Sequence, residues 1–305
     1  MPIPVTAMNW PDPALLARLE NYRLVHRRPV FGQASGRWRS RLKGGGVEFA
    51  DYREYTPGDE PRRIDWKAYA RLRRLYVREF LDDRRDTSLL VLDLSASMDW
   101  GEVAHKGRYA LGLALGLGVC AQAGHGSVAA VITPPSGSRA GAFFPPAGGR
   151  QGLARLRRFL EQCRPGGRAD PAGALEAVGP TRARIHSLYL ISDLWDLSGL
   201  EDFLRRAAAW AREVTVLHVL APGEREPQGE GEWTLVDAET GEKMQVSLTP
   251  AALAAYRQRL TEHLGEVRAC CGRWGARYVE LDSGTSLEDT MLSVLPRAGV
   301  IRLGR

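Results

Sequence analysis

The sequence is poor in cysteine and in long apolar runs, and each shortage excludes a class of protein. Its 305 residues include four cysteines, with no Cys-x-x-Cys pair and no zinc-like spacing to histidine. No apolar run reaches the roughly 20 residues of a membrane-spanning helix, and the amino terminus lacks the charged-then-apolar pattern of a secretory signal. We therefore expect a reduced, cytoplasmic protein without structural zinc or a transmembrane segment.

Positive charge is concentrated near the amino terminus. Residues 1–85 carry 18 Lys and Arg against 11 Asp and Glu, whereas the rest of the chain carries 24 against 25. Trp66, Tyr69 and Tyr76 lie among the arginines of this region, a pattern that can bind nucleic acid or an anionic surface. We favour the alternative, in which the arginines form a solvated face and the aromatic side chains form a small core. Nucleic-acid binding is therefore not the function we expect.

Strands alternate with helices from Ser88 onward. Predicted strands are Ser88–Asp93, Ser127–Ile132, Ser187–Ser192, Val214–Leu220 and Tyr278–Leu281. Predicted helices are Tyr109–Ala123, Gln151–Cys163, Pro171–Val178, Leu200–Ala211 and Pro250–Trp274. This alternation predicts an α/β fold, a doubly wound and mostly parallel sheet covered by helices on both faces.

The organisation around this sheet is also predicted from the sequence. Residues 1–86 form an N-terminal basic module with a short helix, Pro13–Tyr22, and β-strands, and residues 87–305 form the α/β domain. The turn Ala238-Glu239-Thr240-Gly241 indicates a hairpin inserted after the fourth core strand. The Pro- and Gly-rich stretches Thr133–Gly149 and Ala221–Gly231 are expected to be loops. Gly112, Gly116 and Gly118 are expected to let their helix pack closely against the sheet.

Asp93, Ser95 and Ser97 follow the first predicted core strand at alternate positions. Open α/β sheets bind ligands at the carboxyl ends of their strands. A carboxylate and two hydroxyls are hard oxygen donors that suit Mg²⁺ or Mn²⁺. The motif therefore predicts a divalent-cation site, although Asp93 could instead cap the following helix.

Two further acids can reach the same edge of the sheet. Asp193 ends the strand Ser187–Ser192, and Asp170 precedes the helix Pro171–Val178. Each could also cap a helix. The presence of acids at two strand ends favours a shared metal site, so Asp93, Ser95, Ser97, Asp193 and Asp170 are the predicted ligands.

The chain resembles a known architecture in two places. Asp93-x-Ser95-x-Ser97 with the later Asp193 resembles the metal-ion-dependent adhesion site of von Willebrand factor A domains. The block from Tyr52 to Lys67, YREYTPGDEPRRIDWK, resembles the signature of a bacterial family of unknown function numbered fifty-eight, in which it precedes such a domain. The resemblance implies a von Willebrand factor A-like, Rossmann-type fold and association with MoxR-type AAA+ ATPases.

The resemblance also exposes one departure from the adhesion-site pattern. Aligning the loop Gly166-Gly167-Arg168-Ala169-Asp170 on its acid places Ala169 where such domains carry a threonine that binds the metal. Alanine offers no side-chain oxygen, so we expect a degenerate site with weaker affinity for Mg²⁺ or Mn²⁺. Arg168 could compete with the cation.

Three functions are weighed from these features. We favour a non-catalytic protein-interaction adaptor that binds a carboxylate of a MoxR-type AAA+ ATPase or of its client protein. The sequence lacks the Gly-x-x-x-x-Gly-Lys-Ser/Thr loop, so we expect no ATP hydrolysis by that route. The alternatives are a metal-dependent phosphoesterase, which lacks an evident general base, and binding of nucleic acid or an anionic surface through the basic module.

Overall fold

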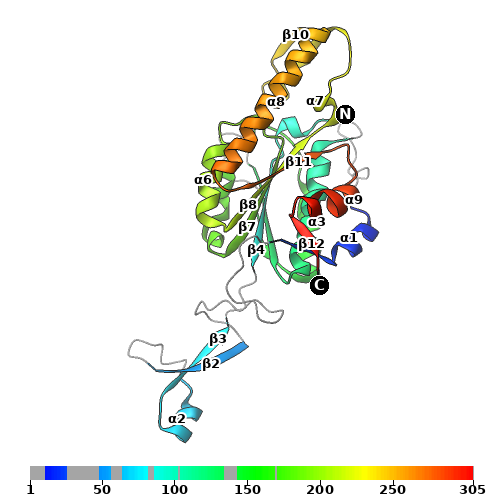
Figure 1. The fold of residues 1–305 in the computed structure, drawn as a ribbon. Helices are drawn as coiled ribbons and strands as arrows, with labels where there is room; N and C mark the ends of the chain where they lie inside the picture. The colour runs from blue at the N-terminus through cyan, green and yellow to red at the C-terminus, as the bar shows by residue number, and fades with distance from the viewer. Residues whose placement is uncertain are drawn as a thin grey trace. The chain divides into compact units, whose positions relative to one another are not determined.

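The computed structural model describes residues 11–25, 48–55, 64–81, 86–101, 104–133, 143–168 and 170–304 (Figure 1). The chain divides into two compact units. The larger joins the residues up to Arg27 to Asp86–Arg305, and the smaller is Arg28–Arg85. We describe each unit by itself.

A six-stranded sheet forms the centre of the larger unit. Its strands are β4 (Thr87–Leu92), β5 (Ser127–Ile132), β6 (Phe143–Ala147), β7 (Ile185–Ser192), β8 (Glu213–Leu220) and β11 (Arg277–Asp282). The spatial order is β11-β8-β7-β4-β5-β6, and only the edge strand β6 is antiparallel to its neighbour. Numbered along the chain, this is the 3-2-1-4-5-6 order of doubly wound sheets. The predicted α/β architecture is confirmed.

The central strands are apolar because both of their faces are covered. All residues of β4 and β7 are buried. Along β4, Leu90 and Leu92 belong to one core cluster, whereas Leu89 and Val91 belong to the cluster on the opposite face. Burying each such side chain stabilises the fold by about 1.5–3 kcal/mol. The uninterrupted apolar run is therefore typical of a strand whose two faces are both buried.

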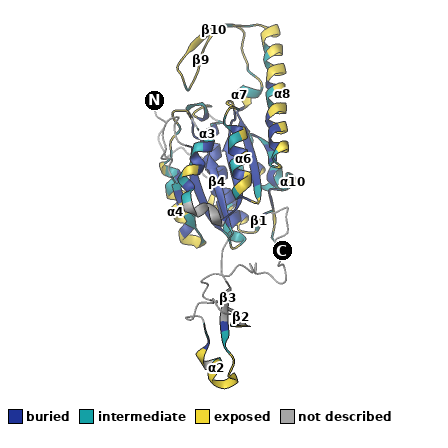
Figure 2. Cartoon of the chain, turned by 90° about the vertical axis from the view of Figure 1, so that its left-hand side faces the viewer, coloured by how far each residue is buried: buried dark blue, intermediate teal, exposed yellow. Residues whose placement is uncertain are grey.

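Helices cover the sheet on two sides (Figures 1 and 2). On one side lie α3 (Lys106–Ala123), α4 (Gly149–Gln162) and a C-terminal segment of α9 (Leu287–Asp289), a π-helical turn (Thr290–Val294) and α10 (Leu295–Arg297). On the other lie α5 (Pro171–Ala174), the 3₁₀ segment Leu175–Arg184, α6 (Leu200–Trp210) and α8 (Pro250–Arg273). Within the described segments, no helix is both long and apolar enough to cross a bilayer.

The glycines of α3 admit neighbouring helices rather than the sheet, which corrects the prediction. A Cβ atom on Gly112 would lie 2.5 Å from Leu287 Cδ1, and one on Gly116 would lie 2.9 Å from Met291 Cε. Gly118 faces Leu156 of α4 in the same way. The small residues therefore let α3 be buried between the sheet and a second layer of helices.

The amino-terminal segment belongs to the larger unit, so the predicted boundary at residue 86 is wrong for residues 11–25. Helix α1 (Pro13–Leu19) packs Leu19, which is fully buried, into the core beside α3. Strand β1 (Tyr22–Leu24) pairs with β12 (Ile301–Leu303) near the other end of the chain (Figure 1). Because the two strands are so distant in sequence, no local sequence pattern in either segment predicts that they pair.

Both predicted loops contain regular structure. The stretch Thr133–Gly149 includes β6, whose Pro145 and Pro146 are tolerated because an edge strand need not donate all its amide hydrogens. The stretch Ala221–Gly231 includes the short helix α7 (Pro222–Arg225). The predicted hairpin is confirmed as β9 (Gly231–Val236) and β10 (Lys243–Leu248).

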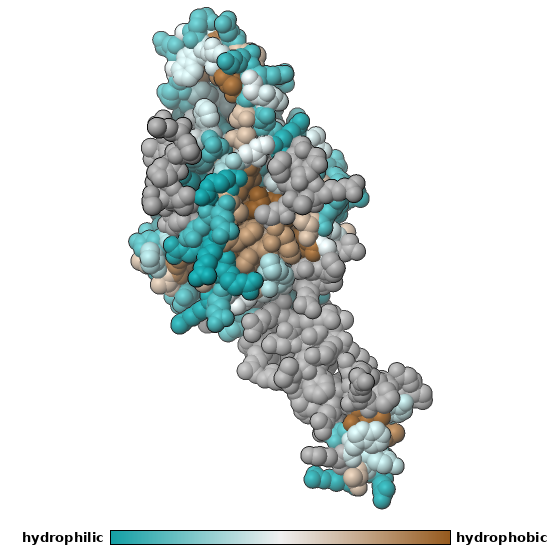
Figure 3. Space-filling view, turned by 180° about the vertical axis from the view of Figure 1, so that it is seen from behind, coloured by the Kyte–Doolittle hydropathy of each residue, from teal (hydrophilic) through white to brown (hydrophobic). Residues whose placement is uncertain are grey.

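The smaller unit is an antiparallel pair, β2 (Glu48–Glu54) and β3 (Tyr76–Leu81), connected through α2 (Trp66–Leu72). The predicted aromatic core is wrong for Trp66, which is 61% exposed and meets Tyr69 edge to face. Apolar residues are visible on the surface of this unit and of the hairpin region (Figure 3). Arg62, Arg63 and the rest of residues 56–63, half of the signature block, lie outside the described residues.

Candidate functional site

The site lies where the strand order of the sheet reverses. Asp93 follows β4 and Asp193 follows β7, and these two central strands are neighbours. The chain leaves them toward opposite sides of the sheet, which opens a crevice between their carboxyl ends. The placement predicted from the two strand-end acids is confirmed.

Asp93 is held rigidly at the base of the crevice. Its Oδ1 accepts a hydrogen bond from the Ser95 amide at 2.9 Å, and its Oδ2 accepts one from the Ser192 hydroxyl at 2.6 Å. The residue is buried. Burial raises the pKa of the Asp93 carboxyl, and the negative charge of Asp193 raises it further. A cation at this position would relieve both effects.

The two serine hydroxyls of the motif are adjacent. Ser95 Oγ and Ser97 Oγ lie 2.9 Å apart. In an octahedron with metal–oxygen bonds of about 2.1 Å, neighbouring ligands are about 3 Å apart. The spacing and the hard oxygen donors therefore fit Mg²⁺ or Mn²⁺. In the described segments no three His, Cys, Asp or Glu side chains are grouped to hold a metal, so the hydroxyls would be essential ligands.

Asp193 has a partner that the sequence did not suggest. Lys106 Nζ, fully buried, donates to Asp193 Oδ2 at 2.6 Å and to Glu224 Oε1 at 2.5 Å. Glu224 also accepts from the Trp195 indole at 3.0 Å and from the Ala221 amide at 2.7 Å. This ion triad of Lys106, Asp193 and Glu224 occupies one oxygen of the predicted ligand Asp193.

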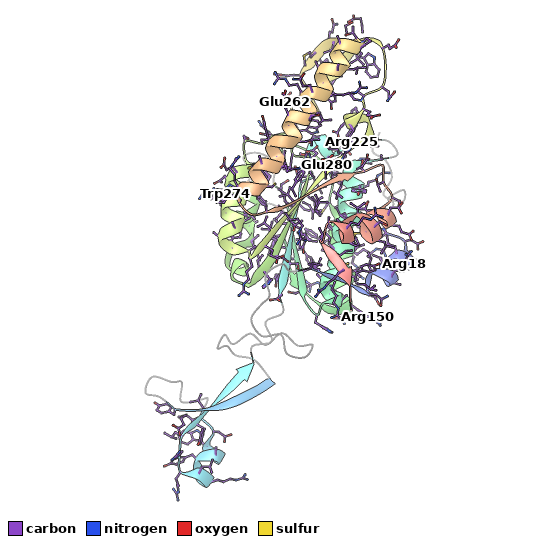
Figure 4. All side chains as sticks on the ribbon, in the orientation of Figure 1. Arg18, Arg150, Arg225, Glu262, Trp274 and Glu280 are labelled. Atoms are coloured by element: carbon purple, nitrogen blue, oxygen red, sulfur yellow. The ribbon has the colours of Figure 1, made fainter. Side chains whose placement is uncertain are left out.

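Neighbouring elements hold this triad in place. His218 Nε2 lies 2.7 Å from the Asp193 carbonyl oxygen, and His218 Nδ1 lies 2.9 Å from the Tyr278 hydroxyl. Burial lowers the pKa of His218 to about 4, so the ring is neutral at pH 7. Arg225, the residue after Glu224, forms an ion pair of 2.5 Å with Glu280 of β11 (Figure 4).

The loop before α5 closes the opposite side of the crevice. The Gly166 amide donates to the Leu94 carbonyl, and the Ala96 amide donates to the Gly167 carbonyl, both at 2.8 Å. Asp170 also caps α5, because its Oδ1 accepts from the Gly173 amide at 2.9 Å. Ala169 itself lies outside the described residues.

All five predicted ligands line one pocket of about 320 Å³. Arg168 and Glu239 line it as well. The Arg168 guanidinium forms ion pairs with Asp196 and with Glu239. Hydrogen bonds from Ser198 and the Arg168 guanidinium hold the pKa of Asp196 at about 2. Acidic groups therefore dominate the pocket, with Arg168 and Lys106 as compensating cations.

Residues 51–266 match a family model described as "Protein of unknown function DUF58". The chain belongs to the DUF58 family. This DUF58 protein is 30% identical over 273 residues to uncharacterized proteins of Mycobacterium tuberculosis and Mycobacterium bovis, and the match covers 88% of the chain and 85% of each relative.

Solved structures with similar folds are more distant from this DUF58 protein. They include a BatB protein from Bacteroides thetaiotaomicron (14% identity, TM-score 0.39, 70% of this chain and 98% of the other). A second is an aerotolerance-related membrane protein from Bacteroides fragilis (16% identity, TM-score 0.42, 69% of this chain and 98% of the other). A third is a von Willebrand factor type A protein from Catenulispora acidiphila (11% identity, TM-score 0.36, 73% of this chain and 43% of the other).

Sequence reasoning identified the acids and serines but missed the residues that hold them. Lys106, Glu224 and Ser192 reach the site from α3, α7 and β7, and no motif marks them. The sequence predicts Glu239 only as part of a hairpin turn. A lysine at the start of an apolar helix was the one available signal.

Proposed function

We propose that this DUF58 protein is a non-catalytic, cytoplasmic binding module whose pocket holds Mg²⁺ or Mn²⁺ and recognises a carboxylate of a partner protein. The partner is a MoxR-type AAA+ ATPase or its client. The observation that carries the proposal is the Ser95–Ser97 hydroxyl pair beside the buried Asp93 carboxylate, in a pocket at the reversal point of the sheet.

Asp93, Ser95 and Ser97 would hold the metal. Asp193 and Asp170 add negative charge to the same pocket, and Mg²⁺ commonly keeps several water ligands. The ion would supply positive charge to which a partner's carboxylate binds. Asp193 contributes less than predicted, because Lys106 already neutralises it.

Titration with Mn²⁺, followed by the electron paramagnetic resonance signal of the free ion, tests the metal site. Asp93→Ala and the double variant Ser95→Ala/Ser97→Ala should each weaken binding at least tenfold. Ser198→Ala is the matched control, since it removes a hydroxyl from the same pocket but not from the pair. Equal affinity of wild type and Asp93→Ala would refute the metal assignment.

Affinity capture tests the partner. The wild-type protein should retain an AAA+ ATPase in Mg²⁺, and both EDTA and Asp93→Ala should release it. Retention that is indifferent to both treatments would contradict recognition through this pocket.

A second candidate function is favoured by the exposed surface of the smaller unit. Trp66 and Leu72 are each 61% exposed, and Arg71, Arg73 and Arg74 lie beside them. Exposed aromatics among arginines can stack on bases and neutralise phosphates. Binding of single-stranded RNA that falls steeply with salt and is lost in Trp66→Ala would support this function. No binding at low salt would exclude it.

A further inference from the structure

Glu239 is an exception within the β9–β10 hairpin. From Gly231 to Gln245 every residue is exposed except Glu239, which is half-buried. A two-stranded hairpin is marginally stable by itself in water. The burial of this one acidic side chain therefore calls for a physical reason.

Hydrogen bonds within the turn of the hairpin fix the position of Glu239. Asp237 Oδ1 accepts hydrogen bonds from the amides of Glu239 at 2.8 Å and Thr240 at 2.7 Å. Gly241 completes the turn with φ +73°, and its amide donates to the Asp237 carbonyl at 2.9 Å. These bonds fix the direction in which residue 239 leaves the turn.

The Glu239 carboxylate reaches the candidate site. It lines the same pocket as Asp93 and Ser95, and its Oε2 lies 3.5 Å from Arg168 Nε. Burial raises the pKa of Glu239, and the charges of Asp93 and Asp193 raise it further, whereas Arg168 lowers it. A carboxylate is thus held at the mouth of an acidic pocket by one arginine.

We propose that the Glu239 carboxylate occupies the place in the pocket where a partner's carboxylate binds, and that the β9–β10 hairpin therefore acts as a tethered lid. A partner's carboxylate must displace Glu239 from Arg168 in order to bind. This inference rests on the proposed function, since it assumes that the pocket accepts a carboxylate. A tethered group acts at an effective concentration of the order of millimolar. A partner must therefore supply further contacts besides one acidic residue, which gives the site its selectivity.

Trypsin measures whether Glu239 holds the hairpin closed. Lys243 is the only tryptic site between Arg225 and Arg257, and cleavage in a locally opening segment follows the population of its open form. Glu239→Gln and Arg168→Gln should each raise cleavage after Lys243 by two- to fivefold, the range expected for loss of an ion pair that is partly exposed to solvent. Glu230→Gln removes the same charge from an exposed position just before the hairpin, far along the chain from the cleaved bond, and should leave the rate unchanged. Equal rates for Glu239→Gln and Glu230→Gln would contradict the proposal that Glu239 holds the hairpin closed.

Binding of glutarate, a small dicarboxylate probe, tests the occupancy. With saturating Mn²⁺, Glu239→Gln should bind glutarate at least fivefold more tightly than the wild type or Glu242→Gln. If Glu239→Gln binds no glutarate, with or without Mn²⁺, the occupant role fails. If it binds glutarate through Arg168 without any response to Mn²⁺, the metal assignment fails and the occupant role stands.

Discussion

Removal of the Lys106 ammonium is the most demanding test of the site's electrostatics. In Lys106→Met the side chain keeps its volume, but Asp193 and Glu224 lose charged hydrogen bonds of 2.6 and 2.5 Å. Their side chains are only 3% and 14% exposed. Breaking a buried ion pair by removing one partner costs about 3–5 kcal/mol, because the other charge stays buried without compensation.

Urea denaturation followed by tryptophan fluorescence measures this loss in the free energy of unfolding. The triple variant Lys106→Met/Asp193→Asn/Glu224→Gln removes the uncompensated charges and should recover more than half of it. Lys243→Met, at an exposed lysine of the hairpin, is the control and should change stability by less than about 0.5 kcal/mol. A loss below 1 kcal/mol in Lys106→Met, or a triple variant no more stable than the single one, would show that the triad does not carry this energy.

Three further predictions concern the frame around the site. Burial lowers the pKa of His218 from 6.5 to about 4, so the unfolded state binds a proton at a higher pH than the folded state does. Protonation of His218 should therefore lower the free energy of unfolding by about 2 kcal/mol between pH 7 and 5. Urea denaturation of His218→Gln should lack this contribution. Gly126→Ala would place a Cβ 2.8 Å from the Asp86 carbonyl oxygen and should lower the free energy of unfolding by about 1–3 kcal/mol. Gly272→Ala on α8, with open space around the added Cβ, should raise it by about 0.5–1 kcal/mol. Equal shifts in melting temperature for the two variants would refute this contrast. Phe203→Ala in the fully buried core of α6 should cost about 3–5 kcal/mol, and Trp233→Ala, whose side chain is 44% exposed, should cost clearly less by the same measurement.

The core strands could be predicted from the sequence because their signal is local. The run from Leu89 to Leu92 is apolar throughout, as a strand buried on both faces requires. The acid that ends β4 and the acid that ends β7 were expected at the same edge, because parallel strands end on the same side. The alternation of such strands with helices was sufficient to predict the fold class, and the two strand-end acids indicated the edge at which the site lies.

The rest of the site depends on contacts between segments that are distant along the chain. Lys106 and Asp193 are 87 positions apart, and Lys106 and Glu224 are 118 positions apart. Pairing of β1 with β12 also gave no signal in either segment. The sequence by itself determined which residues bring hard oxygen donors to the ends of the central strands. Only the tertiary structure decided that Lys106 neutralises one of them, and that Glu239 from the hairpin shares their pocket, since both depend on how the chain returns to this edge of the sheet.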